Sequence, residues 1–134
     1  MDFNMSGEQI ITALMVEDKA RLRELFKPTL AMLGCDVVAE TGSPREAAAL
    51  FGRLHPDVVL SNFSLAMGSG LDVLRDILAL DPGARIFMFT SHSDEATREL
   101  CFKAGACGYI VKNRPIDEFV DNLEAALGAP QIAA

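Results

Sequence analysis

The sequence lacks the features typical of secreted and membrane-spanning chains. Its three cysteines, Cys35, Cys101 and Cys107, are an odd number without metal-type spacing, so we expect reduced and mostly buried thiols. No apolar stretch approaches the roughly 20 residues that a membrane-spanning helix needs. The first ten residues include acidic side chains where a secretory leader has a basic start. These absences predict a cytoplasmic protein without membrane contact.

Basic runs are also missing. The chain has 12 Lys and Arg against 19 Asp and Glu, which gives a formal net charge of -7 and a pI near 4.7. Such a charge repels phosphate backbones. The composition therefore predicts no direct binding to nucleic acid and leaves basic protein surfaces as partners.

What the chain does contain is enough apolar sequence for one core. Half of its 134 residues are hydrophobic and 23% are charged, which is a globular composition. We expect one domain over residues 10–128, an N-terminal extension over 1–9 and a short tail over 129–134.

Apolar runs alternate with helical-period segments in five β-then-α units, which predicts an α/β fold with a doubly wound parallel sheet. We expect strands over 11–16, 35–40, 57–62, 85–89 and 109–111. Helices are expected over 19–33, from 43 onward, and over 71–80, 93–104 and 116–127. Pro28 predicts a bend or break near Lys27. Gly34 and Gly128 are expected to end the first and last helices.

Polar side chains stand where four of these strands end. Glu17 and Asp18 follow the first strand, Asn62 the third, Thr90 the fourth and Lys112 the fifth. Ligands of doubly wound sheets bind outside the carboxyl ends of the strands. Paired carboxylates favour a hard cation such as Mg²⁺, and a lysine beside a hydroxyl suits a phosphoryl group. His55 and His92 are isolated in the sequence, so we expect no catalytic or metal role for either.

Five motifs carry a resemblance to a known family. In order they are Val16-Glu17-Asp18, Pro56-Asp57-Val58-Val59-Leu60, Gly70-Leu71, Phe89-Thr90-Ser91 and the segment over 105–112. Together they resemble the receiver domain of two-component response regulators, of the chemotaxis-receiver type, over about residues 10 to 128. The resemblance implies a flavodoxin-like sheet of five parallel strands in the order 2-1-3-4-5.

The resemblance also implies roles for individual residues. Glu17 and Asp18 correspond to the acidic pair that holds Mg²⁺, with Asp18 as the direct ligand and the Ser64 backbone nearby. Thr90 and Lys112 correspond to the groups that contact the phosphoryl oxygens. Thr90 and Tyr109 correspond to the switch residues that report activation.

Asn62 departs from the family, because it stands where receivers have the aspartate that accepts the phosphoryl group. A neutral amide is a poor nucleophile, so the sequence predicts no phosphorylation there. Asn62 also removes a third carboxylate. At about 4 Å and an effective dielectric near 20, each like-charge pair costs on the order of 4 kcal/mol. We therefore expect a more stable metal-free fold and weaker Mg²⁺ binding than with aspartate.

Three functions compete. The first is a non-enzymatic, atypical receiver that acts through contacts with a histidine kinase or another signalling protein. The resemblance implies that its contact face is the fourth helix, fifth strand and fifth helix, about 93–127. The same face would form a homodimer. The second is an ordinary receiver with an engineered Asp-to-Asn substitution at position 62, although Ala66, where the family often has proline, favours a natural variant. The third is a phosphoryl-transfer hydrolase or flavin protein, which lacks an attacking carboxylate or a phosphate-binding loop here.

Overall fold

A parallel sheet of five strands forms the centre of the molecule. The structure is a computed structural model that describes residues 10–128, so the expected extension and tail lie outside the described residues. The sheet has the order β2-β1-β3-β6-β7. Its strands are β1 (Ile11–Val16), β2 (Cys35–Thr41), β3 (Val58–Ser61), β6 (Ile86–Thr90) and β7 (Gly108–Val111). The predicted flavodoxin-like order 2-1-3-4-5 is confirmed.

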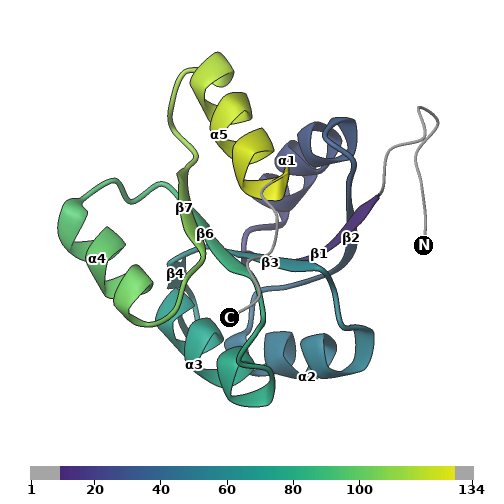
Figure 1. The fold of residues 1–134 in the computed structure, drawn as a ribbon, viewed down its shortest axis with the longest axis vertical. Helices are drawn as coiled ribbons and strands as arrows, with labels where there is room; N and C mark the ends of the chain where they lie inside the picture. The colour runs from purple at the N-terminus through teal and green to yellow at the C-terminus, as the bar shows by residue number, and fades with distance from the viewer. Residues whose placement is uncertain (1–9, 129–134) are drawn as a thin grey trace.

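Five helices cover both faces of this sheet. They are α1 (Ala20–Met32), α2 (Pro44–Leu54), α3 (Gly70–Leu80), α4 (Glu95–Lys103) and α5 (Ile116–Gly128). Helices α1 and α5 lie on one side, and α2, α3 and α4 lie on the other (Figure 1). Two apolar cores result, one on each side of the sheet. The three central strands are buried on both faces, as expected for parallel strands under helical layers.

Local signals position the helix starts. Ser43 caps α2 by accepting a hydrogen bond from the Glu46 backbone N–H, and Pro44 occupies the first helical position as predicted. Ser69 and Asp72 form an unpredicted capping box at the start of α3. Asp94 caps α4. These caps fix where each strand-to-helix loop ends and so shape the carboxyl edge of the sheet.

Several sequence predictions need correction. Helix α1 runs without a break through Pro28, which lies on an exposed position where the missing backbone N–H removes a single helical bond. Packing of Phe26 and Leu30 against the sheet holds both halves of α1 in place. Gly128 is the last residue of α5 rather than the residue after it. The expectation of mostly buried thiols needs no correction, since Cys35 and Cys101 are buried and Cys107 is exposed.

A short antiparallel hairpin also escaped prediction. Strands β4 (Ser64–Leu65) and β5 (Gly68–Ser69) pair between β3 and α3. Each is two residues long, too short to show an alternating pattern. The hairpin folds the loop after Asn62 over the carboxyl edge of the sheet.

None of the helices within residues 10–128 is long and apolar enough to cross a membrane.

Candidate functional site

The parallel strands bring the predicted polar residues to one edge of the sheet. Glu17 and Asp18 follow β1, Asn62 follows β3, Lys112 follows β7, and Thr90 is the last residue of β6 rather than the first after it. Backbone hydrogen bonds tie these ends together: the Asn62 N–H donates to Val16 O and the Lys112 N–H to Thr90 O, both at 2.9 Å. The strand-end residues therefore form one constellation.

Glu17 and Lys112 form a buried ion pair beneath this edge. Lys112 Nζ lies 2.6 Å from Glu17 Oε1, and the two side chains are 5% and 4% exposed. The ammonium also lies over two aromatic rings, 5.2 Å from the centroid of Phe89 and 5.7 Å from that of Phe26. The second Glu17 oxygen accepts the Lys19 backbone N–H at 3.2 Å. Lys112 thus has its counter-ion inside the protein, and that counter-ion is Glu17.

A cleft of about 300 Å³ opens beside this pair. Its lining residues come from the loops after β1, β3 and β6, and they are Asp18, Lys19, Asn62, Ser64, Leu65, Ala66, Ser91 and His92. Asp18 Oδ2 accepts the Ala66 backbone N–H at 3.0 Å, which links the first loop to the β4–β5 hairpin. Glu17 and Lys112 are not among the lining residues, so Asp18 is the carboxylate that faces the cleft.

Both polar atoms of the Asn62 amide bind within its own loop. Its Oδ1 accepts the Phe63 backbone N–H at 2.9 Å, and its Nδ2 donates to the Ser64 carbonyl at 3.1 Å. An ionised aspartate has no hydrogen to donate, so the second contact is specific to an amide or a protonated acid. Asn62 therefore stabilises the turn after β3 by donating a hydrogen bond to the Ser64 carbonyl.

Thr90 and Tyr109 meet at the backbone of His92. Thr90 is fully buried, and its Oγ1 accepts the His92 N–H at 3.3 Å. The Tyr109 hydroxyl donates to the His92 carbonyl at 2.7 Å. Burial, more than the nearby Cys101 and Asp94, raises the pKa of Tyr109 to about 12. Both predicted switch residues therefore hold the loop between β6 and α4.

His92 is the site residue that sequence reasoning missed. Its Nε2 lies 2.8 Å from Ser64 Oγ in a hydrogen bond, and its ring packs edge-on against Phe63 with centroids 5.5 Å apart. His92 is isolated in the sequence but not in space, because it joins the loops after β3 and β6; the expectation that it has no catalytic or metal role stays a prediction. Its position two residues after Thr90, at the same strand end, could have indicated that His92 lies at the site.

The donor chemistry at this edge fits a hard cation such as Mg²⁺. Asp18, Asn62 Oδ1 and the Ser64 carbonyl offer only oxygen, with Glu17 behind them. Within residues 10–128 no group of three or more His, Cys, Asp or Glu side chains gathers as a metal site. The neutral Asn62 and the Ser64 carbonyl would have to complete the ligand set. Asp18 Oδ2, Asn62 Oδ1 and the Ser64 carbonyl each already accept a hydrogen bond from the protein, and Glu17 is paired with Lys112.

Comparisons with known proteins agree with this geometry. The sequence profile of the response regulator receiver domain matches residues 13–124. The chain is 31% identical over 99 residues to the chemotaxis protein CheY of Thermotoga maritima, covering 74% of this chain and 82% of that protein. Some curated relatives are longer: the chain spans 49% of the transcriptional regulatory protein DegU of Brevibacillus brevis, with 28% identity over 116 residues.

Solved structures give the same family. A two-component response regulator of the LuxR family from Aurantimonas sp. SI85-9A1 superposes with a TM-score of 0.83 at 32% identity, covering 90% of this chain and 86% of that one. The CheX–CheY–BeF3–Mg complex of Borrelia burgdorferi contains a chain that superposes with a TM-score of 0.82 at 18% identity, covering 95% and 96%. At that identity the second match supports the fold alone.

The buried ion pair predicts that replacing Lys112 lowers the free energy of unfolding much more than replacing Lys27 does. Lys112→Met leaves the Glu17 carboxylate buried without a partner, so we expect the free energy of unfolding to fall by about 3–5 kcal/mol. Adding Glu17→Gln to this variant should recover part of that loss. Lys27→Met is the control, because Lys27 is 33% exposed in its pairs and such pairs contribute about 0–1 kcal/mol. Equal losses for the two single variants, measured by urea unfolding, would contradict the assigned role of Lys112.

Tyr109 predicts an alkaline loss of stability. Its pKa is about 12 in the fold against an ordinary value of 10.0, so the fold favours the neutral phenol. This stabilisation is complete below pH 10 and disappears as the pH rises toward 12. The chain has one tyrosine and no tryptophan, so tyrosinate absorbance reports Tyr109 alone. We expect ionisation near pH 10 in urea and about two pH units higher in the native protein. Ionisation at the same pH in both states would contradict the burial of this hydroxyl.

Proposed function

The chain belongs to the response regulator receiver domain family of two-component signalling, and we propose that within this family it is an atypical receiver. In this proposal the domain does not accept a phosphoryl group at residue 62, catalyses no reaction and acts through contacts with other signalling proteins. Cytoplasmic residence is part of the same proposal.

The single observation that carries the proposal is the state of the Asn62 amide. Its nitrogen carries no lone pair available for attack on phosphorus, because that pair is delocalised into the carbonyl. Its oxygen and nitrogen are both engaged, with Phe63 N–H and Ser64 O. An acyl phosphate needs a carboxylate oxygen at this position. The chemistry of residue 62 therefore supports a receiver without phosphotransfer.

The remaining contacts support a weakened Mg²⁺ site. Magnesium sheds water reluctantly and is bound mainly through carboxylates. At Asp18 Oδ2 the ion would share the oxygen with the Ala66 N–H, and at the Ser64 carbonyl it would share the oxygen with the Asn62 amide. Glu17 is neutralised by Lys112. We propose that the protein's own donors stabilise this edge in place of the metal, and that Mg²⁺ binds weakly.

Partner contacts fit the face of α4, β7 and α5, about 93–127. Leu100 is 51% exposed there, and Phe102 is 38% exposed with the Arg98 guanidinium 4.9 Å above its ring. Tyr109 links this face to the cleft through the His92 carbonyl. The Borrelia burgdorferi CheY is in complex with CheX. A histidine kinase or another signalling protein is the class of partner we propose, without direct binding to nucleic acid.

A second candidate is an ordinary receiver in which an engineered substitution replaced an aspartate by Asn62. Retention of Glu17, Asp18, Thr90 and Lys112 favours it, because loss of phosphotransfer removes the need for these residues. In that case the parent protein accepts a phosphoryl group from a histidine kinase with Mg²⁺ as cofactor. The codon at position 62 of the encoding gene separates the two candidates.

Phosphorylation by a small donor tests both candidates. We expect acetyl phosphate with Mg²⁺ to add no phosphoryl group to the native chain and to add one to Asn62→Asp, as read by intact mass. Asn122→Asp is the matched control, because it adds the same carboxylate on an exposed position of α5. An adduct on Asn62 of the native chain would refute the proposal. Failure of Asn62→Asp to gain an adduct would refute the assignment of position 62 itself.

Magnesium titration tests the role of Asn62 in the metal-free fold. Asn62→Asp loses the hydrogen bond to Ser64 O and adds a carboxylate near Asp18, so we expect metal-free stability to fall by about 1–3 kcal/mol. The same substitution should bind Mg²⁺ more tightly than the native chain, and Mg²⁺ should restore its stability. Urea unfolding with and without Mg²⁺ measures both effects. Equal Mg²⁺ affinity for the two proteins would show that residue 62 has no part in the metal site.

A further inference from the structure

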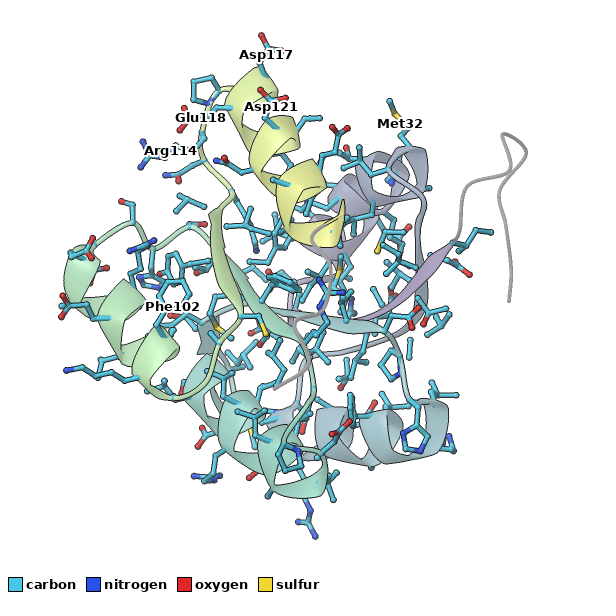
Figure 2. All side chains as sticks on the ribbon, in the orientation of Figure 1. Met32, Phe102, Arg114, Asp117, Glu118 and Asp121 are labelled. Carbon is cyan, nitrogen blue, oxygen red and sulfur yellow. The ribbon has the colours of Figure 1, made fainter. Side chains whose placement is uncertain are left out.

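Helix α4 buries a single side chain. Of its nine residues only Cys101 is buried, at 0% exposure, and it packs in the core on this side of the sheet. The other side chains of α4 are exposed, apart from the half-buried Thr97. Figure 2 shows Phe102 on this helix, which lies at one margin of the molecule. An element that buries so little apolar surface opens more readily than the rest of a fold.

A second thiol, that of Cys107, lies on the same side of the sheet. Cys107 is exposed, and its N–H donates to Ile86 O at 2.8 Å, which extends the pairing of β7 with β6 by one residue. Side chains two residues apart on a strand point to the same face, so Cys107 shares the face of Tyr109. Tyr109 packs against the buried cluster that contains Cys101. Both thiols therefore belong to the α4 side of β7.

The turn between α4 and β7 brings the two cysteines close along the backbone. The Ala106 N–H donates to Cys101 O at 3.0 Å, and Cys107 is the next residue. The two thiols differ in burial, since Cys101 lies in the core and Cys107 at the surface. A disulfide has a narrow geometry, so the last turn of α4 must open for the two sulfur atoms to meet.

We propose that Cys101 and Cys107 form an intramolecular disulfide when a peroxide oxidises the protein, and that this disulfide holds the end of α4 open. The accessible Cys107 reacts first: its sulfur takes one oxygen atom from hydrogen peroxide, which gives a sulfenic acid and water. The Cys101 sulfur then attacks the Cys107 sulfur as α4 opens. The S–O bond breaks, and the hydroxide leaves with the Cys101 proton as a second water. Two electrons pass from the two thiols to one peroxide.

Burial keeps the Cys101 thiol unreactive in the reduced protein. It raises the pKa of Cys101, and the thiolate is the reactive form of a cysteine. Oxidation is therefore expected to start at the surface and to reach Cys101 only through Cys107. The disulfide changes the face of α4 and β7, which is the face proposed above for partners. Its formation requires neither a partner nor a phosphoryl group.

Peptide mapping of the full chain after treatment with hydrogen peroxide tests the disulfide. Trypsin cleaves after Lys103, so Cys101 and Cys107 fall in separate peptides that the disulfide joins. We expect this joined pair in the native chain, and we expect a thiol reductant to separate it. Cys35→Ala is the matched control and should give the same pair, because Cys35 lies in the core on the other side of the sheet. Cys107→Ser should give no joined pair.

Ionisation of Tyr109 measures the movement of α4. Burial and the nearby Cys101 raise the pKa of Tyr109 to about 12 from its ordinary value of 10.0. Opening α4 removes both causes, so tyrosinate absorbance should appear at a lower pH in the disulfide form of Cys35→Ala, which has no third thiol for exchange. Peroxide-treated Cys107→Ser should keep the native value.

Three results would overturn the proposal. The first is an oxidised Cys107 that stays unlinked, and the second is a disulfide that joins Cys107 to Cys35 or to another chain. The third is ionisation of Tyr109 at the same pH with and without the disulfide. None of them bears on the proposed lack of phosphorylation at Asn62, since intact mass after acetyl phosphate measures that separately.

Discussion

Burying the Glu17–Lys112 ion pair is the constraint on which the carboxyl edge of the sheet depends. Two charges can leave water only when they meet closely and their other hydrogen-bonding atoms are satisfied. Here the pair distance is 2.6 Å, Lys19 N–H binds the second carboxylate oxygen, and Phe26 and Phe89 present ring faces to the ammonium. The strands β1 and β7, separated by two others in the sheet, are thereby connected by side chains as well as by the sheet.

A neutral residue 62 is consistent with this constraint. If a carboxylate stood at position 62, Asp18 would face another negative charge across a cleft of about 300 Å³. The amide avoids that repulsion and adds a donor to the Ser64 carbonyl. It leaves Glu17 as the counter-ion of Lys112. At this edge the Glu17 carboxylate is therefore paired by Lys112 and the Ser64 carbonyl by the Asn62 amide.

The periodicity of the sequence predicted the strands and the residues at their ends. It did not predict the features that depend on individual side-chain contacts. Parallel strands force Glu17, Asn62 and Lys112 to one edge, so pattern alone placed them. Pattern could not show that Glu17 turns to Lys112 while Asp18 faces the cleft, because neighbouring residues differ there only in side-chain direction. The unbroken α1 at Pro28 reflects tertiary packing that outweighs a local propensity.

His92 shows why a side chain that looks isolated in sequence can be central in space. It has no titratable neighbour within the motif, yet its backbone binds Thr90 and Tyr109 and its ring binds Ser64. These contacts make one continuous path from the cleft to the exposed face of α4 and β7. A ligand or partner shifts Tyr109 only if it binds more tightly to an arrangement in which the Tyr109–His92 contact differs. Because Ser64 and Tyr109 hold the same residue, an event that moves His92 acts on both ends of the path together.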